Sequence, residues 1–547
     1  MVGPEKPRRL RGAVSLALAA LACTTLAACG GSSSSAGGGS ANGDTLVIAD
    51  QATPVAVDPT AYSGEPMLES IYNTYATLLR FKATEVAPGV MGDDIHASAE
   101  EGLEGWLAKS WRRTSPTTLR FELRRGVESA AGNELTSADV VYTVKRHLAL
   151  RLVGSQTLGQ GRIVSAKPIG RYAVELRTSV PSSVAPFIAT QPQGLGILDA
   201  TEVKQHATGS DPWAEDWLKL HTAGFGPYQL SETVPGQRFT FTANPNYFDG
   251  APALRTVEWR QVSSASDRVA LLRAGEVDVA ETIPPQLRKD LRDSGNVRVV
   301  DVGEEWSVLT VGLTPNFKRP PLDERAVRQA IAYLLPNQQI IDNVLQREGS
   351  IRRSWIAASL LPGRAGEFWT YEENVEKAKQ LLAEAGLPEG FETSISFDSS
   401  QATHEQIASL LKAALARGGI DVSLNKLSAT KYSDTLAKRN FDILMTYGGP
   451  LTPNAAYELD LWYDHDNFID SGSYHNPEVE KLIGRAITAD DREQYLQTLS
   501  AADRILAQDV PRIGIVNTGD HYQFSADLRG FYWRANTNHY DWARFSR

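Results

Sequence analysis

The chain has 547 residues with 55 lysines and arginines against 65 aspartates and glutamates, which gives a net charge of −10. An acidic balance argues against a nucleic-acid-binding protein, because such proteins carry a basic surface. The length exceeds what one hydrophobic core normally supports, so the sequence predicts several structural units.

The first 28 residues have the composition of an export signal. An apolar run at 13–22 follows a basic start, and Leu26-Ala27-Ala28-Cys29 comes after it. These four residues resemble a bacterial lipobox, which implies that Cys29 becomes the lipidated first residue of the mature chain. Residues 29–43 are rich in glycine and serine and are expected to form a flexible linker.

Two alternatives remain open for this segment. A secretory signal with a cysteine placed by chance would leave the protein without an anchor, and Arg8-Arg9 leaves the twin-arginine route open beside the general secretory route. The other cysteine, Cys23, lies within the signal. The mature chain therefore has no pair of cysteines for a disulfide, and a large core must supply its stability.

The first part of the mature chain alternates strand and helix patterns. An apolar run at 45–49 predicts a buried strand, and apolar residues at helical spacing predict a helix over 67–79. Strict alternation predicts a strand over 119–124. Thr136 and Asp139 then have the spacing of a capping box at the start of a helix.

The central stretch predicts a β-meander followed by a β-α-β step. Gly224-Phe225-Gly226-Pro227-Tyr228 has the chemistry of a tight turn that leads into a strand. Period-two alternation follows at 238–242, and a further strand is expected at 257–262. Ser266 is expected to cap a helix that stops at Gly275, and a last strand is expected at 276–280.

The second half is richer in helical patterns. Asp323 is expected to cap a helix that ends before Pro336, and Asn374 to cap a helix that Gly386 closes. Further patterns predict helices over 404–417, 477–486 and 490–507, and strands over 420–424 and 441–444.

Four short motifs follow one another within about sixty residues. They are Gly-x-Gly-Pro-Tyr at 224–228, Asn-Pro-x-Tyr at 244–247, Arg-Val-x-x-Leu at 268–272, and Gly-Glu-Val-Asp at 275–278. In this order they closely resemble the central signature of the family 5 extracellular solute-binding proteins, the oligopeptide, dipeptide and nickel receptors of ABC importers.

The resemblance implies a mixed α/β, two-lobed fold of the type II periplasmic-binding-protein class, with an extra subdomain and two strands crossing between the lobes. It divides the mature chain into lobe I at 45–82, the extra subdomain at 83–215, lobe I again at 216–285, lobe II at 286–508, and a return to lobe I at 509–547.

Such receptors bind their ligand in a cleft that closes around it, and a cleft of this kind is lined by aromatic and polar groups together. For each aromatic, a plain core position is the alternative interpretation. The resemblance assigns these residues to the cleft: Tyr62, Ser63, Glu65, Phe225, Trp306, Tyr447, Gly448, Tyr457 and Trp462.

One departure from the peptide receptors concerns the ligand's amine. Those receptors hold it with an aspartate in a Trp-x-x-Asp-like segment, whereas no acid occurs here between Tyr447 and Tyr457. An ammonium group in a closed cleft needs a partner charge. The ligand is then a blocked peptide, a siderophore-like molecule, a sugar or a metal complex, or else another acid substitutes: Glu65, Glu304, Glu305, Glu458 or Asp460.

Signs of catalysis are weak in this sequence. No Gly-x-Ser-x-Gly occurs, and the two Ser-x-x-Lys matches, Ser423–Lys426 and Ser428–Lys431, lack the Lys-Thr-Gly strand that a penicillin-interactive enzyme needs. The nine histidines show no metal-ligand spacing. The sequence therefore predicts no enzyme, no metal site and no cofactor, with a secreted Ser-x-x-Lys hydrolase as the alternative from another class.

The hypothesis from the sequence is a lipid-anchored, extracytoplasmic, monomeric receptor. It captures a small polar solute, with an oligopeptide favoured, and delivers it to the permease and ATPase subunits of an ABC importer. A signalling or adhesive lipoprotein without an importer is a further alternative.

Overall fold

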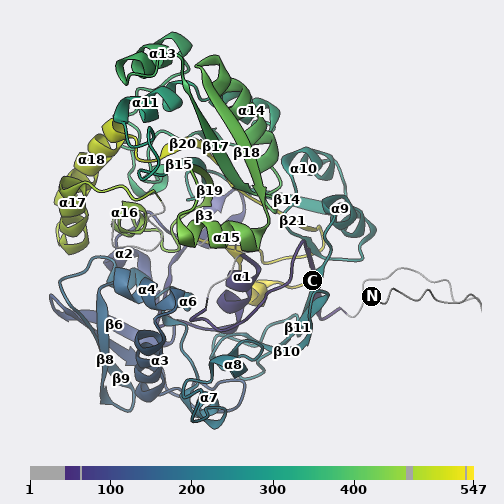
Figure 1. Ribbon diagram of the computed structural model, residues 1–547. Helices are drawn as coiled ribbons and strands as arrows, with labels where there is room; N and C mark the ends of the chain where they lie inside the picture. Colours follow the sequence, from purple (N-terminus) through teal and green to yellow (C-terminus); the bar gives the residue numbers. More distant parts are fainter. Residues whose placement is uncertain (1–42, 62–64, 464–471, 536–538) are drawn as a thin grey trace, which may run out of the picture. The chain divides into compact units, whose positions relative to one another are not determined.

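The computed structural model describes residues 43–61, 65–463, 472–535 and 539–547. Within them the largest sheet has seven strands and contains segments from near both ends of the chain (Figure 1). Its strands, in spatial order, are β10 (Tyr228–Val234), β11 (Arg238–Ala243), β12 (Thr256–Gln261), β1 (Thr45–Asp50), β13 (Val279–Ala280), β21 (Asp520–Ser525) and β14 (Val297–Val302).

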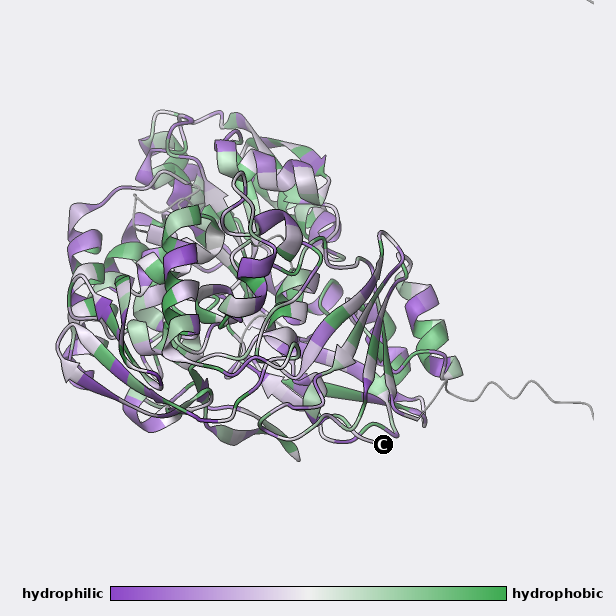
Figure 2. Cartoon of the chain, turned by 90° about the horizontal axis from the view of Figure 1, so that it is seen from below, coloured by the Kyte–Doolittle hydropathy of each residue, from purple (hydrophilic) through white to green (hydrophobic). Residues whose placement is uncertain are grey.

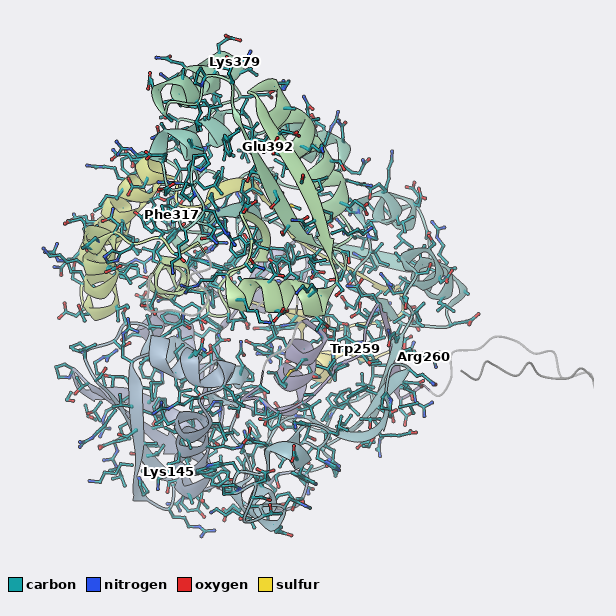
Figure 3. The ribbon with its side chains drawn as sticks, viewed as in Figure 1. Lys145, Trp259, Arg260, Phe317, Lys379 and Glu392 are labelled. Carbon is teal, nitrogen blue, oxygen red and sulfur yellow. The ribbon has the colours of Figure 1, made fainter. Side chains whose placement is uncertain are left out.

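The central signature forms one half of this sheet, as the sequence predicts. Strands β10, β11 and β12 make an antiparallel meander, and β12 and β13 both run parallel to β1. Side chains alternate along β12, where Trp259 is buried and its neighbour Arg260 lies on the other face (Figure 3). Helix α9 (Ala265–Ala274) connects β12 to β13 and ends at Gly275, but its cap is Ser264 rather than Ser266.

A six-stranded sheet organises the second part of the chain. Parallel pairing joins β17 to β18 and to β19, whereas β15 runs antiparallel to β19 and β20. In spatial order its strands are β16 (Ser350–Ile351), β20 (Ile513–Asn517), β15 (Thr310–Pro315), β19 (Ile443–Gly448), β17 (Phe391–Asp398) and β18 (Ile420–Leu427).

The chain passes between these two sheets twice, at 303–309 and at 518–519. We call residues 43–302 and 520–547 the first region and residues 310–517 the second region. Both passages come later than the boundaries expected at 286 and 509. The reason is that β14 pairs along its whole length with β21 in the first sheet, while β20 pairs with β15 in the second. Apolar runs predict strands but not the sheet that each strand joins.

Three smaller sheets complete the first region. The expected extra subdomain contains one of them, which starts at β6 and therefore later than residue 83, because β3 and β4 pair with the C-terminal strand β22. The sheet of the extra subdomain contains, in spatial order, β6 (Ala108–Ser115), β7 (Thr118–Leu123), β9 (Ala173–Thr178) and β8 (Ile163–Gly170). The second sheet contains β23 (His539–Tyr540), β22 (Tyr532–Arg534), β4 (Val90–Asp93) and β3 (Ala83–Ala87), and the third pairs β2 (Leu79–Phe81) with β5 (Leu103–Gly105).

Helices of the first region other than α9 are α1 (Glu65–Thr74), α2 (Ala99–Gly102), α3 (Ser137–Leu150), α4 (Val153–Gln160), α5 (Ala185–Ile188), α6 (Pro192–Leu195), α7 (Ala200–Gln205), α8 (Glu215–Leu218) and α10 (Pro285–Arg292). Those of the second region are α11 (Arg325–Tyr333), α12 (Asn337–Asn343), α13 (Val375–Glu384), α14 (His404–Arg417), α15 (Ala429–Lys438), α16 (Ala455–Tyr463), α17 (Pro477–Thr488) and α18 (Arg492–Asp509). Among the described residues no helix combines the length and apolar character that a membrane span requires.

Local capping signals predicted most helix ends correctly. The Thr136–Asp139 capping box forms, and Asn374 caps α13 by accepting a hydrogen bond from the backbone N–H of Lys377. The prediction for Asp323 was wrong, since the N-cap position of α11 is Glu324 and has no side-chain cap. Helix α1 ends at Thr74 instead of 79, where Gly226 packs so closely that a Cβ atom there would lie 2.4 Å from the Thr74 carbonyl.

Apolar residues gather in four clusters inside the described part of the chain. The largest one combines first-region residues with Trp355, α16, α17 and α18 of the second region, while a separate cluster fills the second region around β15, β17 and α14. Hydrophobic segments lie on the inner sides of helices and strands, with hydrophilic ones outside (Figure 2). The largest cluster thus contains residues of both regions, and the second region also has a cluster of its own.

A buried ion pair ties the extra subdomain to the segment after β1. The guanidinium of Arg146 on α3 contacts both carboxylate oxygens of Asp58, at 2.6 and 2.8 Å, and neither side chain is more than 3% exposed. Its Nε donates a further bond to the carbonyl of Trp213 at 3.0 Å. Removal of either charged group would leave the other one buried without a partner.

We expect Arg146→Met to lower the free energy of unfolding by roughly 3–5 kcal/mol, because the Asp58 carboxylate would remain buried without its partner. Urea unfolding followed by circular dichroism measures the change. Lys219→Met is the matched control, since Lys219 pairs with Asp216 on the surface and a surface pair contributes about 0–1 kcal/mol. Equal effects of the two substitutions would contradict the assignment.

Acidic side chains also cluster beneath α1. Glu69 accepts a hydrogen bond from the indole N–H of Trp542 at 2.7 Å, and Glu281 accepts one from the hydroxyl of Tyr540 at 2.7 Å. Burial, with the nearby charge of Asp50, raises the pKa of Glu281 to about 8. Burial and the charge of Glu281 likewise raise the pKa of Glu69 well above its ordinary value.

Since Glu281 binds its proton more tightly in the folded chain, its contribution to stability is complete below its ordinary pKa of 4.5 and is lost as pH rises from there to about 8. We expect Glu281→Gln, which keeps the hydrogen-bonding shape, to be more stable relative to wild type at pH 8.5 than at pH 5. Melting temperatures across this range measure the effect. The exposed Glu276→Gln should show no such trend, and a trend of opposite sign for Glu281→Gln would refute the prediction.

Candidate ligand-binding site

Polar side chains from both regions meet where α16 of the second region packs against α4 of the first. Helix α4 in turn contacts α6, and α6 contacts α1. Figure 1 shows α16, α4 and α6 as neighbouring helices. We call the side chains Tyr72, Gln191, Gln193 and Tyr457 at this junction the polar junction; they come from α1, the α5–α6 segment and α16.

Tyr72 anchors the first-region side of the polar junction. Its hydroxyl donates a hydrogen bond to the side-chain oxygen of Gln191, and its ring lies 5.1 Å from the ring of His539. Burial raises the pKa of Tyr72 well above the ordinary value, so this phenol stays protonated and remains a donor.

Two members of the polar junction have no hydrogen-bond partner although they are buried. The hydroxyl of Tyr457 lies close to Thr157 of α4 but makes no hydrogen bond of normal geometry, and Tyr457 is 1% exposed. The side-chain amide of Gln193 likewise makes none through either its oxygen or its nitrogen, at 0% exposure. Buried groups left in this state each cost about 1–3 kcal/mol, so they mark a place where a polar molecule would be stabilised.

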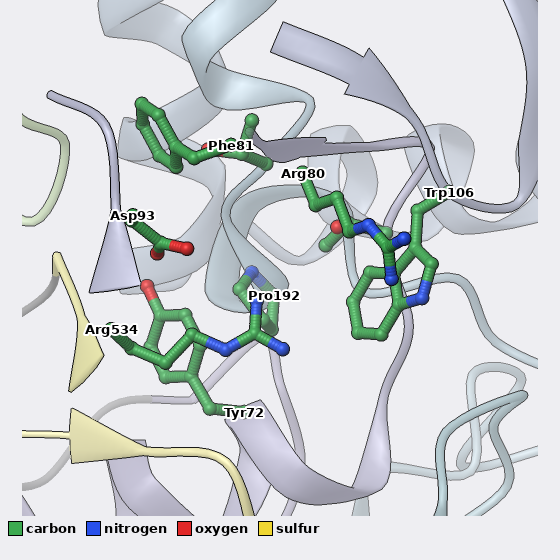
Figure 4. Close-up of a pocket in the computed structure, with 9 residues that line it drawn as sticks. Tyr72, Arg80, Phe81, Asp93, Trp106, Pro192 and Arg534 are labelled. Carbon is green, nitrogen blue, oxygen red and sulfur yellow. The ribbon is translucent and has the colours of Figure 1, made fainter. Parts of the chain in front are cut away.

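A small cavity adjoins the polar junction on the first-region side. Tyr72, Pro192 and Arg534 line one part of it (Figure 4), and the guanidinium of Arg534 lies 5.3 Å from the ring centre of Trp106, which also lines the cavity. The cavity has room for about one water molecule. In this conformation the cavity is therefore too small for a peptide.

Acidic residues of α16 already have partners. Glu458 is fully buried and accepts hydrogen bonds from the guanidinium of Arg352 at 3.1 Å and from the backbone N–H of Ala357 at 2.9 Å. Burial raises the pKa of Glu458, and the charge of Arg352 opposes that rise. Both partners belong to the second region, so this pair holds α16 to its own core.

Asp460, in contrast to Glu458, contacts the first region. It pairs with Arg162 of the first region at 2.7 Å, and its side chain is only 2% exposed. A second contact across the regions lies nearby, where the backbone N–H of Ser183 donates to the carbonyl of Ile487 at 2.7 Å. These contacts hold the two regions together on the α16–α17 side.

The predicted aromatic residues do not form a single cluster. Trp306 lies in the first passage between the regions and is half-buried, with its ring 4.1 Å from the ring of His96. Tyr447 is the second-last residue of β19, and its ring lies 6.1 Å from that of His404. Trp462 stacks on the guanidinium of Arg512 at 3.8 Å. Of the predicted aromatics that the structure describes, only Tyr457 lies in the polar junction.

The remaining predicted residues have other surroundings. Phe225 is 0% exposed in the main core, and Gly448 pairs with Thr310 at a φ of 121°, a conformation that favours glycine. Glu65 begins α1. Tyr62, Ser63 and Cys29 lie outside the described residues, and their roles stay predictions.

Sequence reasoning missed several residues of this site. Tyr72 has the helical spacing of a core residue, and Gln191 and Gln193 lie in a loop-like stretch without a motif. Arg162 has a φ of 58°, which a sequence pattern does not reveal. The helical spacing that places Tyr457 and Asp460 one turn apart on α16 was the one signal available for this interface.

Neither Ser-x-x-Lys match forms a nucleophile with a neighbouring amine. The hydroxyl of Ser428 caps α15 by accepting from the N–H of Lys431, whose own amine lies 3.2 Å from Asp434. The amine of Lys426 pairs with Glu405 at 2.6 Å. These lysines are therefore engaged with carboxylates, not with the serines.

Comparison with known proteins agrees with this architecture. Residues 102–470 match the family model of the bacterial extracellular solute-binding proteins, family 5 middle. The probable D,D-dipeptide-binding periplasmic protein DdpA of Escherichia coli (strain K12) is 24% identical over 495 residues, which cover 89% of this chain and 91% of DdpA.

Two solved structures share the fold. The ABC transporter-associated periplasmic binding protein DppA from Helicobacter pylori, in complex with the peptide STSA, superposes with a TM-score of 0.80 at 19% identity, covering 92% of this chain and 98% of DppA. NikA from Staphylococcus aureus, in complex with Ni(L-His)2, gives a TM-score of 0.75 at 17% identity, covering 92% and 100%. The expected mixed α/β fold of the type II periplasmic-binding class is confirmed.

This chain belongs to the family 5 bacterial extracellular solute-binding proteins. The resemblance found in the central signature is thereby confirmed, and the output of the protein is binding of a solute.

We expect Asp460→Asn to loosen the contact between the regions, because Arg162 would lose its charged partner. The amide of Ser183 should then exchange with solvent about tenfold faster, which corresponds to about 1.4 kcal/mol. Hydrogen-exchange mass spectrometry of the peptide that contains Ser183 measures this. Asp434→Asn, which removes a surface partner of Lys431 and Lys438, is the control and should leave that peptide unchanged.

Proposed function

We propose that this protein is an extracytoplasmic receptor that encloses an oligopeptide between its first and second regions and delivers it to an ABC importer. The polar junction carries the proposal, because it places buried donors and acceptors without partners where the two regions meet. Similarity to DdpA and to peptide-bound DppA supports a peptide as the ligand.

The geometry suits binding by closure. Two short passages, 303–309 and 518–519, connect the regions, and rotation about such a pair of segments opens and closes a cleft. A ligand that contacts both sides favours the closed state by its greater affinity for that state. Contacts such as Arg162–Asp460 form only when the regions approach each other, so they add to the stability of the closed form.

Membrane attachment through Cys29 is part of the same proposal. The sequence Leu26-Ala27-Ala28-Cys29 and the glycine- and serine-rich stretch after it support a lipid anchor with a flexible tether. Two or more acyl chains hold a protein stably on a membrane, whereas a single chain does so only reversibly. The receptor would then act as a monomer close to the permease and ATPase subunits of its importer.

Native mass spectrometry of the gently purified full chain tests the proposal. A bound mass in the range of a short peptide should leave when the protein is partly unfolded, and tandem fragmentation should yield amino-acid residues. A chain that carries no such mass and gives no thermal shift with a mixture of short peptides would refute peptide binding.

We expect Trp306→Ala and Tyr447→Ala each to weaken peptide binding about tenfold while changing the melting temperature little, because both rings are half-buried at the ends of elements that border the passages between the regions. Isothermal titration with a peptide recovered by mass spectrometry measures affinity. Trp217→Ala is the matched control, since Trp217 is also half-buried but stacks between His206 and His221 on α8. If both site variants bind normally, these residues do not contact the ligand.

A further inference from the structure

We propose that the site binds the uncharged amide portion of a peptide, so that a peptide with blocked ends is bound more tightly than the same peptide with a free amine. The inference rests on the proposed function and specifies its ligand. It follows from the groups that the structure describes where the two regions meet: those without hydrogen-bond partners are neutral, and the acidic ones already form ion pairs or accept hydrogen bonds.

The described members of the polar junction that make no hydrogen bond of normal geometry are uncharged. Tyr457 offers a hydroxyl, and Gln193 offers a carboxamide that can donate and accept at once. A carboxamide and a hydroxyl match the N–H and C=O groups of a peptide unit, which need neutral partners of both kinds.

Diverting Glu458 to a ligand's ammonium would be costly. Its carboxylate already holds the guanidinium of Arg352, and Arg352 is only 3% exposed. Removing one member of a buried ion pair leaves the other charge uncompensated, at a cost of about 3–5 kcal/mol. Glu458 therefore serves the packing of α16 against the second region.

The other nearby carboxylates are engaged as well. Asp460 pairs with Arg162 across the interface. Asp93, which lines the cavity next to Tyr72, accepts hydrogen bonds from the hydroxyl of Tyr532 at 3.0 Å and from the N–H of Ala535 at 3.1 Å. In the segment from Tyr447 to Tyr457 the sequence contains no acidic residue at all.

An ammonium group enclosed beside these described residues would thus lose its hydration without finding an unengaged carboxylate among them, and desolvation of an unpaired charge is far more costly than that of an amide. Blocking the amine removes this penalty. The site then discriminates by rejecting charge, which is an effective route to specificity because the unfavourable ligand leaves its own group unpaired.

A pair of matched ligands tests this directly. The full chain is titrated with an equimolar mixture of tripeptides and, separately, with the same mixture acetylated at the amine and amidated at the carboxyl end. We expect the blocked mixture to bind at least tenfold more tightly by calorimetry. Tighter binding of the free mixture would overturn this inference alone, whereas no binding of either would overturn the proposed function and this inference with it.

A single-atom change tests the site. Tyr457→Phe removes a hydroxyl that has no partner in the protein, so the melting temperature should stay equal or rise, while affinity for the blocked mixture should fall about tenfold. Tyr463→Phe is the matched control: this residue also lies on α16, is 1% exposed and has an unpartnered hydroxyl, but it lines a different space beside Trp462 and Arg512. Normal binding by Tyr457→Phe, or equal losses in both variants, would overturn the assignment.

Discussion

The buried hold on helix α1 is the constraint on which the site depends. Asn73 donates to the carbonyl of Tyr540 and accepts from the backbone N–H of Trp542, whose indole also reaches Glu69. The last residues of the chain therefore fix a helix near its beginning. This clamp holds Tyr72, one residue before Asn73, in a defined position against Gln191.

Buried charged groups and buried neutral polar groups differ in whether they have partners in this fold. Some buried charges form ion pairs, such as Arg146–Asp58 and Arg352–Glu458, and others, such as Arg268, donate to backbone carbonyls. Burial raises the pKa of the two acids beneath α1. The groups left without partners at the polar junction are neutral, and these cost much less to bury. A cleft that must exist both with and without its ligand can tolerate unpaired hydroxyl and amide groups far better than unpaired ions.

The features that the sequence predicted correctly are those that depend on residues close together in the chain. Caps such as Asn374 and the Thr136–Asp139 box depend on residues three positions apart, and the meander at β10–β12 depends on neighbouring strands, so these were predicted correctly. The family resemblance predicted the fold. The passages between the sheets were placed too early, because the pairing of β14 with β21 joins segments more than two hundred residues apart.

The site shows the same limit more strongly. Tyr457 was predicted to be a binding residue, but Tyr72 and Gln193, which lie beside it, carry no local mark of their role. Phe225 was assigned through the motif that contains it, whereas the motif's glycines serve the close packing of the turn on α1 and the phenylalanine fills the core. The motif therefore identifies where this segment lies in the fold, but the surroundings of each side chain determine whether that side chain packs in the core or lines a binding site.

Helix α16 connects recognition to closure through its spacing. Tyr457, Glu458 and Asp460 occupy three directions around one helix: towards the polar junction, towards Arg352 in its own region, and towards Arg162 across the interface. Because the three residues share one helix, the position of Tyr457 at the polar junction and the Arg162–Asp460 ion pair across the regions are set together. Under the proposed function, the neutral groups that would recognise the ligand are thus distinct from the charged groups that hold the two regions in contact.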